Sequence, residues 1–565
     1  MHTGHASAPK SSLVLNPSSF VAHKNTKSIL DLAMIFESGL SSATILALLL
    51  SLTVVHYIIV TLYRVTIHPL AKYPGPLKYS VSSWPSALRI GTGVWHLELH
   101  ELHQRYGDIV RWAPNGLSFR TTEALHDIYT DQDANLVKTG WTDANIGLNN
   151  GKFNIISCSD RKIHAGRRYI LAQALTDNNL RKVEPLVLQC VRSLCDVVGS
   201  VPRQLEDRDQ KEYWGGPLDM GHWSSMMTID VLGELCFGKS FGALDRGSAH
   251  LKTLLMGAAK LTQKIAFLPI RHLLYPILTN PRFAKMFFGK TAASRVAYRN
   301  EVKAVVQGRL DAAHTADTRE DFFHHLTKAS NKETGACLTT EELVSESTAL
   351  IAAGNDTAST CIASIFFYLL RSPLALTKTA SEITSTFTDV EEITSQRLKE
   401  LPYLRAVIDE SLRLSPPIPG LLTRRVLTGG ALIDNIYCPA DTVIGVSAYA
   451  LHHDEKFFPS ASSFIPERWI PGPHADVAVK TSPHTIDLAK SAFCAFSSGP
   501  RGCIGKNMAY MEIGLAIARL LFLYDIRAPL LDHTSPGTSV DANEYTLWDY
   551  FISDREGPIV EFKKR

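Results

Sequence analysis

The amino-acid sequence predicts a mainly α fold with a small β part, preceded by one N-terminal transmembrane helix. Stretches with the spacing of amphipathic helices occupy much of the chain, whereas strand-like segments are few and short. One uninterrupted apolar segment near the N-terminus is long enough to cross a bilayer. The helical stretches are 97–106, 178–198, 222–237, 296–313, 341–371, 397–414 and 507–524. The strand-like segments are Ile109–Trp112, Leu117–Arg120 and Thr442–Ser447.

The composition is that of an ordinary globular protein. Of the 565 residues, 45% are hydrophobic and 20% are charged, which excludes disordered and collagen-like classes. A formal net charge of +3 without a Lys/Arg-rich block argues against a nucleic-acid partner. The nine cysteines are odd in number and form no C-x-x-C pair. We therefore expect no disulfide scaffold, and a reducing compartment for the folded part.

The apolar segment 43–63 is the predicted membrane anchor. As a helix, its 21 residues reach roughly the 30 Å of a hydrocarbon core, and His56 is its only strongly polar side chain. A buried core helix is the alternative; a cleaved signal peptide fits less well, because the segment begins far from the N-terminus. The basic flanks slightly favour a cytosolic C-terminal side. These flanking residues are Lys24, Lys27, Arg64, Lys72 and Lys78.

The remaining boundaries follow from composition. Residues 1–42 are rich in Ser, Thr, His and Ala and are predicted to form a flexible tail. Residues 64–84 form a proline-rich hinge, since three prolines and a glycine between His68 and Pro76 prevent a helix from continuing. Residues 85–565 contain no internal repeat and no second change of composition, so they are predicted to form one catalytic domain.

The clearest chemical motif surrounds Cys503, in the segment 496–505 with the sequence FSSGPRGCIG. Its glycines allow a tight loop that brings the backbone close to a flat ligand. A helix is predicted to start at Lys506, and a cysteine at a helix N-terminus is favoured as a thiolate. Phe496 and Arg501 beside a thiolate suit a planar, apolar cofactor with peripheral carboxylates, such as haem. The alternative is a cysteine that is merely buried.

This segment resembles the F-x-x-G-x-R-x-C-x-G signature of the cytochrome P450 family. The resemblance implies haem b (iron protoporphyrin IX) as the cofactor, with Cys503 as the axial ligand of its iron. It also places Phe496, Gly499 and Arg501 among the cofactor-binding residues. Cys494 lacks this frame of glycine and arginine and is expected only to pack.

A second motif, Ala353-Gly-Asn-Asp-Thr357, lies inside the predicted helix 341–371. An acid and a hydroxyl in an otherwise apolar helix are costly unless they are satisfied or used. Thr357 can donate to the carbonyl of Ala353 or hold a water, so a kinked helix with a capped hydroxyl is the alternative. The motif resembles the family's A-G-x-D-T element, which implies that Asp356 and Thr357 supply protons during oxygen activation.

Two further elements are structural by resemblance. Glu410 and Arg413 form an E-x-x-R pair on one face of a predicted helix. Alone this pair carries little weight, but Pro466-Glu-Arg468-Trp resembles the family's P-E-R-W/F segment. The resemblance implies a cluster of Glu410, Arg413 and Arg468 with a structural role beneath the haem.

Two contacts to the haem carboxylates also follow from the resemblance. One is Arg424, after the proline-rich turn, and the other is His164 with Arg168, in an H-x-x-x-R match to the family's W/H-x-x-x-R helix. Tryptophan is commoner than histidine at the first position, and Ile163 with Arg167 is a shifted alternative. A basic surface helix that contacts a redox partner is the simpler interpretation of this segment.

The resemblance covers essentially the whole chain and is strongest to microsomal enzymes of filamentous-fungal secondary metabolism. It implies a monooxygenase that inserts one atom of O₂ into a lipophilic terpenoid, polyketide or prenylated alkaloid. Electrons would come from NADPH through NADPH–cytochrome P450 reductase, at the endoplasmic reticulum membrane, with the catalytic domain in the cytosol. Residues Asn135–Ile156 and 215–290 are expected to line the substrate pocket. The alternatives are a reductase-independent isomerase or dehydratase, and a non-catalytic haem-binding membrane protein.

Overall fold

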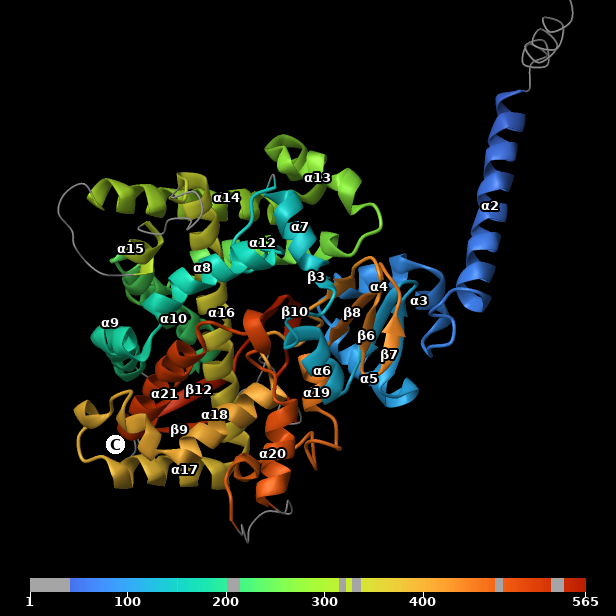
Figure 1. The fold of residues 1–565 in the computed structure, drawn as a ribbon. Coiled ribbons are helices and arrows are strands. Elements are labelled where there is room, and N and C mark those ends of the chain that lie inside the picture. The colour runs from blue at the N-terminus through green and yellow to red at the C-terminus, as the bar shows by residue number, and fades with distance from the viewer. Residues whose placement is uncertain are drawn as a thin grey trace, which may run out of the picture. The chain divides into compact units, whose positions relative to one another are not determined.

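The structure is a computed structural model, drawn as a ribbon in Figure 1. It describes residues 41–149, 151–200, 214–313, 322–327, 337–472, 481–529 and 543–565. The chain divides into two units, Met1–Tyr63 and Arg64–Arg565. The predicted tail 1–42 lies almost entirely outside the described residues, and the hinge and domain boundaries stay predictions.

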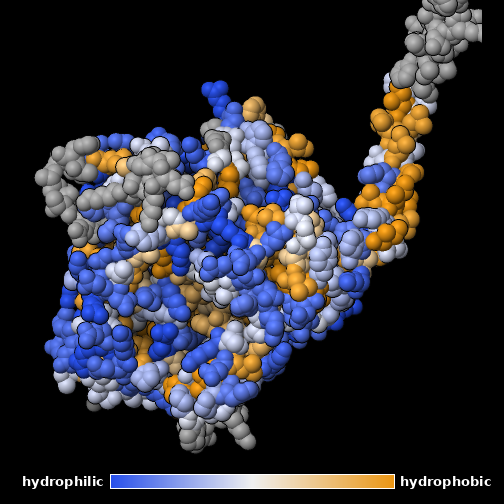
Figure 2. Space-filling model, viewed as in Figure 1, coloured by the Kyte–Doolittle hydropathy of each residue, from blue (hydrophilic) through white to orange (hydrophobic). Residues whose placement is uncertain are grey.

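The described part of the first unit belongs almost wholly to helix α2 (Ser42–Thr66). Its 25 residues contain the predicted anchor 43–63, and none of them is buried. Figure 2 shows that its surface is mostly hydrophobic. The helix is long and apolar enough to cross a membrane, and its exposure argues against the alternative of a buried core helix.

The second unit is built around helix α16 (Thr340–Arg371), which runs through its centre in Figure 1. A capping box starts this helix: the Thr339 side chain accepts from the backbone N–H of Glu342, whose carboxylate accepts from the N–H of Thr339. Most of its central side chains are fully buried. The helices packed against it are α10 (Met220–Phe237), α14 (Pro281–Ala313), α18 (Pro402–Leu414) and α21 (Lys506–Leu523).

The remaining helices surround this core. On the side of α16 they are α8 (Arg161–Ala174), α9 (Asp177–Ser200), α11 (Ala243–Arg246), α12 (His250–Ala266), α13 (Arg271–Thr279), α15 (Phe322–Thr327) and α17 (Pro373–Thr386). Those nearer the sheet or the cysteine loop are α3 (Leu77–Val81), α4 (Ser83–Ile90), α5 (Trp95–Tyr106), α6 (Thr122–Tyr129), α7 (Trp141–Leu148), α19 (Ala448–His452) and α20 (Pro483–Ala492).

The β part consists of one five-stranded sheet and three small ones. The large sheet has the order β1 (Ile109–Ala113), β2 (Gly116–Phe119), β8 (Val443–Val446), β5 (Arg424–Val426) and β3 (Leu136–Lys138). Only β2 and β8 pair in parallel among these described strands. The small sheets are β4 (Leu218–Asp219) with β12 (Ile559–Lys564) and β9 (Tyr524–Arg527), β6 (Ala431–Ile433) with β7 (Ile436–Cys438), and β10 (Trp548–Tyr550) with β11 (Ile552–Asp554).

The predicted class, mainly α with a small β part, is confirmed, and most element boundaries lie close to those expected. One predicted helix, 397–414, is wrong in its first turn. Residues Arg397–Glu400 form a short 3-10 helix, and α18 begins only at Pro402. The reason is Leu401, which precedes the proline and is held out of the α region (φ −114°, ψ 71°).

Candidate active site around Cys503

Cys503 lies in the short connection between a 3-10 turn (Gly499–Arg501) and helix α21. Its N–H donates to the carbonyl oxygen of Phe496 at 2.8 Å, which closes the loop. The thiol keeps accessible surface, although burial by the surrounding protein raises its pKa. Arg168, Lys506 and a backbone hydrogen bond at Gly505 act in the opposite direction.

Glycine is required at position 499 because of both space and conformation. Its φ is +67°, and a Cβ atom there would lie 2.2 Å from the carbonyl oxygen of Tyr129 in α6. The cysteine loop therefore packs directly on the end of α6. Phe496, at the start of the loop, is half-buried, with its ring centroid 5.0 Å from that of Tyr510.

Five basic side chains converge near this loop, on β3, α8, β5 and the 3-10 turn. Four of the predicted cofactor-binding residues are among them, namely His164, Arg168, Arg424 and Arg501, and the fifth is Lys138. Lys138 and the three arginines donate to backbone carbonyl oxygens at 2.6 to 3.2 Å. Within the described ranges, none of them forms an ion pair with a carboxylate. We call these five residues the cation cluster.

In the cation cluster, desolvation and the neighbouring cations lower the pKa values of the basic side chains. Desolvation, together with the nearby Arg501 and the other three cations, lowers the pKa of His164 to about 3. Desolvation lowers the pKa of Arg424 to about 10, and Arg501 contributes. The pKa of Lys138 is also lowered, first by desolvation and then by Arg424 and Arg501. Gathering desolvated cations is unfavourable unless an anion joins them.

The structure distinguishes the two possible registers of the α8 motif. His164 is buried and Arg168 donates to the cysteine loop at Gly502, whereas Ile163 is 45% exposed. Arg167 points instead to the N-terminal part of α16, where its two Nη atoms donate to Glu346 and Glu342. The shifted pair Ile163–Arg167 therefore does not face the cysteine, and the buried His164 does not fit a purely surface helix.

Asp356 and Thr357 lie in the middle of α16. The Thr357 hydroxyl donates to the carbonyl of Ala353 at 2.6 Å. Its side chain is half-buried, on the same part of the helix where Ala353 is exposed and Ala352 and Gly354 are half-buried. Asp356 is fully buried, and its Oδ2 atom has no hydrogen-bond partner in the part of the chain that the structure describes. Burial raises the pKa of Asp356 to about 6, against the opposing effects of Arg555 and Lys252.

The glycine of the same motif allows close packing between helices. A Cβ atom on Gly354 would lie 2.6 Å from a methyl group of Leu232 in α10. Helix α10 can therefore approach α16 closely at the level of Asp356, which agrees with the expectation that another group lies against the helix at this glycine.

Glu410, Arg413 and Arg468 are in direct contact, fully buried or nearly so. The two Glu410 oxygens accept from Arg413 at 2.8 and 2.9 Å and from Arg468 at 3.0 and 3.1 Å. Trp469 and the backbone N–H of Ile465 donate to the same carboxylate at 3.0 Å. Burial alone would raise the pKa of Glu410, but the two arginines outweigh it and lower the pKa to about 2.

Two residues near the site were not found from the sequence. Lys138 carries no motif, because a single lysine in a short strand is usually a solvated side chain. Arg555 follows β11 near the C-terminus, and its Nη1 lies 3.9 Å from the Asp356 carboxylate. Its other Nη atom donates to Ser225 at 2.8 Å and to Ser359. Only the fold brings Arg555, 199 residues downstream, beside Asp356.

The comparisons with known proteins agree with this geometry. The family model of cytochrome P450 matches residues 75–537. Cytochrome P450 monooxygenase apf7 of Gibberella fujikuroi is 33% identical over 526 residues, which cover 90% of this chain and 96% of the relative. Monooxygenase AKT7 of Alternaria alternata is 33% identical over 89% of this chain and 94% of the relative. Trichothecene C-15 hydroxylase of Fusarium sporotrichioides is 30% identical over 87% of this chain and 94% of the relative.

The chain therefore belongs to the cytochrome P450 family, and it is a monooxygenase, an oxidoreductase whose cofactor contains haem iron. This confirms the resemblance drawn from the cysteine motif.

Proposed function

We propose that this monooxygenase binds haem b between the Cys503 loop and helix α16, and hydroxylates a lipophilic secondary metabolite. The observation that carries the proposal is the cation cluster, which surrounds the cysteine loop without a carboxylate partner among the described residues. Haem b is a flat apolar ring with two carboxylates, so it supplies the anions that these side chains lack. An accessible Cys503 thiol beside them is a suitable axial ligand.

The residues that would hold the cofactor belong to the cation cluster and to the Cys503 loop. Arg168, Arg424, Arg501, His164 and Lys138 would bind its carboxylates, and Gly499 and Phe496 would shape the loop around it. Bound haem supplies the activation of dioxygen. Cys503 lies two residues before Gly505, the N-cap of α21, and a backbone hydrogen bond at Gly505 acts to lower the pKa of its thiol against the larger effect of burial.

Asp356 and Thr357 would manage protons. With a pKa of about 6, Asp356 can both hold and release a proton near neutral pH. Its Oδ2 atom makes no hydrogen bond within the described residues, so it remains available to a water or a neighbouring group. The half-buried Thr357 hydroxyl is bonded to the Ala353 carbonyl through its hydrogen, and its oxygen still accepts.

The reaction partners and the location complete the proposal. Electrons would come from NADPH through NADPH–cytochrome P450 reductase, and the substrate would be a terpenoid, a polyketide or a prenylated alkaloid. One relative is named a hydroxylase of a trichothecene, which supports hydroxylation of a fungal metabolite. Helix α2 would anchor the chain in the endoplasmic reticulum with the catalytic domain cytosolic. Exposed apolar side chains on and next to α13 support a second lipid contact; they are Ile270, Leu273, Phe283 and Met286 (Figure 2).

The orientation has a direct test. Protease added to intact microsomes should digest the C-terminal domain, because that domain lies outside the vesicle. Full protection of the domain would contradict a cytosolic orientation.

The function itself is tested by reconstitution with purified reductase, NADPH and an extract of fungal lipids. The full chain should consume NADPH and O₂ and oxygenate at least one lipid, and Cys503→Ala should abolish both. Turnover of a lipid peroxide without reductase would favour the isomerase or dehydratase alternative. Haem binding without turnover of any kind would favour the non-catalytic alternative.

A further inference from the structure

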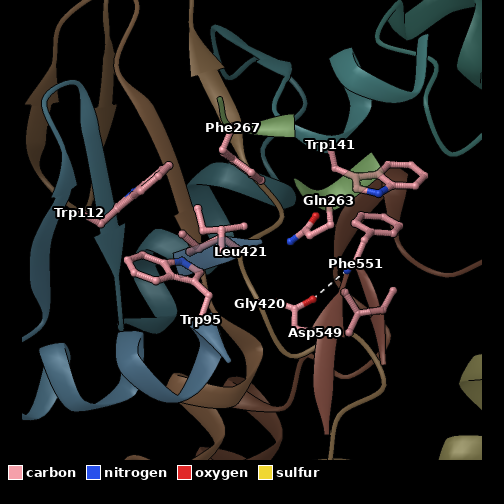
Figure 3. A pocket seen from close by; sticks show the side chains of 11 residues that line it. Trp95, Trp112, Trp141, Gln263, Phe267, Gly420, Leu421, Asp549 and Phe551 are labelled. Carbon is pink, nitrogen blue, oxygen red and sulfur yellow. Dashed lines mark hydrogen bonds between the residues drawn. The ribbon is translucent and has the colours of Figure 1, made fainter. Parts of the chain in front are cut away.

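A small aromatic pocket lies beside the proposed active site and is not explained by haem binding (Figure 3). Its walls include Trp95 of α5, Trp112 of β1, Trp141 of α7 and Gln263 of α12. Asp549 and Phe551, from the β10–β11 hairpin, close it. Two of these residues fall within the segments 135–156 and 215–290 that the sequence predicts to line the substrate pocket.

The polar atoms of this pocket lack partners. The Nε1 atoms of Trp95, Trp112 and Trp141 and the Oε1 atom of Gln263 are buried and make no hydrogen bond to any described residue. Trp95, Trp112 and Gln263 are each less than one-tenth exposed. An indole N–H can only donate, so the lining offers three donors without a described partner, of which a single oxygen atom can accept at most two. An amide that can both donate and accept lies beside them. Leaving buried polar atoms unpaired is unfavourable, which points to a ligand group that completes them.

The charges of the lining determine which ligand group fits. Among the described residues that line the pocket there is no lysine or arginine, so a carboxylate would find no counter-charge. Asp549 is the one acid of this described lining, and burial raises its pKa to about 6. An ammonium ion would accept no hydrogen bond from the indole donors and would leave them unpaired. The group that remains is a neutral oxygen.

The size of the pocket limits the ligand to one functional group. Trp141 stacks on Phe551 with ring centroids 4.0 Å apart and planes 10° from parallel. Trp95 and Trp112 meet edge to face at 6.1 Å. One carboxylate oxygen of Asp549 lies so close to Gly420 that a Cβ atom there would be 2.1 Å away. These rigid walls leave space for a group about the size of a water molecule.

The pocket shares its segments with the proposed active site. Trp141 follows Lys138 of the cation cluster by three residues, and Leu421, also in the lining, precedes Arg424 by three. The same hairpin that carries Asp549 leads to Arg555, which contacts Asp356. The pocket is therefore built from the same chain segments as the cation cluster and the Arg555–Asp356 contact.

We propose that this pocket binds one neutral oxygen function, a hydroxyl or a carbonyl, at the end of an otherwise apolar substrate and so orients that substrate for oxidation. This inference rests on the proposed function, and it narrows the substrate class to metabolites that already carry such an oxygen before they reach this enzyme. The preceding step in the reaction sequence must then be one that installs or retains a hydroxyl or a carbonyl group.

The test uses the full-length holoenzyme in lipid nanodiscs and five probes on one skeleton: decalin, 2-decalol, 2-decalone, 2-aminodecalin and decalin-2-carboxylate. Dissociation constants are measured by equilibrium dialysis, with intrinsic tryptophan fluorescence as a second readout. Trp112→Phe removes one N–H but keeps a ring, and Gln263→Leu removes the amide at similar volume. Trp84→Phe, at an exposed position outside the pocket, is the matched control.

The alcohol or the ketone should bind more tightly than decalin, by about twofold to tenfold for each hydrogen bond made. Trp112→Phe and Gln263→Leu should each reduce this preference and leave decalin binding unchanged, and Trp84→Phe should change neither. Three results would overturn the inference. Decalin could bind as tightly as the alcohol and the ketone, or the preference for these two probes could survive in both variants. The third result is tightest binding of the amine or the carboxylate. The CO difference spectrum of the same samples separates the two proposals, since it reports thiolate ligation whichever probe binds.

Discussion

Two buried groups of charged residues in this molecule differ in one respect: whether the protein itself supplies both signs of charge. Around Glu410, one carboxylate receives hydrogen bonds from two arginines and a tryptophan. In the cation cluster, by contrast, Lys138 and three arginines donate to backbone carbonyls and form no ion pair with a carboxylate among the described residues. The first group has both signs of charge within the protein, whereas we propose that the carboxylates of haem complete the second.

This difference separates structural from functional burial of charge. A completed group stabilises the fold once formed, and loses stability when one member is removed. An uncompleted group costs stability in the free protein and recovers it on binding. Asp356 is intermediate: Arg555 lies 3.9 Å from its carboxylate and Asn355 donates to its Oδ1 atom, but its Oδ2 atom has no hydrogen-bond partner among the described residues.

The largest effect is expected where the completed group is broken. Glu410→Gln leaves Arg413 and Arg468 buried without a counter-charge, which should lower the free energy of unfolding by about 3–5 kcal/mol. Urea unfolding and the yield of soluble protein measure this loss. Glu392→Gln, in an exposed pair with Arg397, is the control and should unfold almost as the wild type does. A Glu410→Gln protein with wild-type stability would show that the group is not structural.

The next effect concerns coupling. Thr357→Ala removes a hydroxyl at the proposed site and should slow the proton transfer by roughly 10²–10⁴-fold, so product per NADPH falls and hydrogen peroxide rises. Thr360→Ala is the control, since its hydroxyl makes the same type of bond, to the Asp356 carbonyl, but is fully buried. Wild-type product per NADPH in Thr357→Ala would remove this helix from oxygen activation. Loss of haem would instead favour the alternative that Thr357 holds the fold, in a kinked helix with a capped hydroxyl.

The pH dependence of the free energy of unfolding tests the burial of Asp356. The pKa of Asp356 is raised from 3.8 to about 6 on folding, so the acid is protonated in both states below about pH 4. As the pH rises from about 4 to about 6, the unfolded chain loses this proton while the folded protein keeps it, so the free energy of unfolding falls; above about pH 6 the acid is ionised in both states. Between pH 4 and 7 the wild type should therefore lose up to roughly 3 kcal/mol relative to Asp356→Asn in urea unfolding. The exposed Asp441→Asn should show no such divergence from the wild type. If the free energies of unfolding of Asp356→Asn and the wild type changed in parallel with pH, the claim that burial raises the pKa of Asp356 would be contradicted.

The smallest predicted effect is that of removing one cation of the cluster. It should weaken haem binding in the holoprotein but should not destabilise the apoprotein. Arg424→Met removes one cation of the cluster but keeps its packing against Tyr129. Haem should leave about tenfold faster, measured by transfer to an excess of a haem-scavenging apoprotein, because a charge-assisted contact is lost. The apoprotein should unfold at the same or a higher urea concentration. Arg425→Met, at the exposed next position of the same strand, should change neither quantity, and a less stable Arg424→Met apoprotein would contradict the comparison.

The sequence predicted the fold class and the site motifs because each depends on local pattern. The spacing of apolar residues predicted α9, α10 and α16 to within about two residues, and the glycine–cysteine frame predicted the Cys503 loop. The error at 397–401 arose because one proline outweighed a helical pattern.

The parts that were missed depend on contacts between distant segments. Arg555 reaches Asp356 across 199 residues, and Lys138 joins the cation cluster only because β3 pairs with β5. The aromatic pocket combines six segments whose residues form no motif: 90–95, 112, 141, 263–267, 418–421 and 549–551. No local pattern records such contacts, so only the three-dimensional structure shows them.

The account depends most on Cys503 as the ligand of a cofactor that the cation cluster holds. The most direct measurement is the CO difference spectrum of the reduced full-length protein, for the wild type, Cys503→Ala and the buried Cys494→Ala. The wild type and Cys494→Ala should show the red-shifted Soret band of thiolate ligation, and Cys503→Ala should lose it. Retention of that band in Cys503→Ala would place the ligand elsewhere and contradict the account.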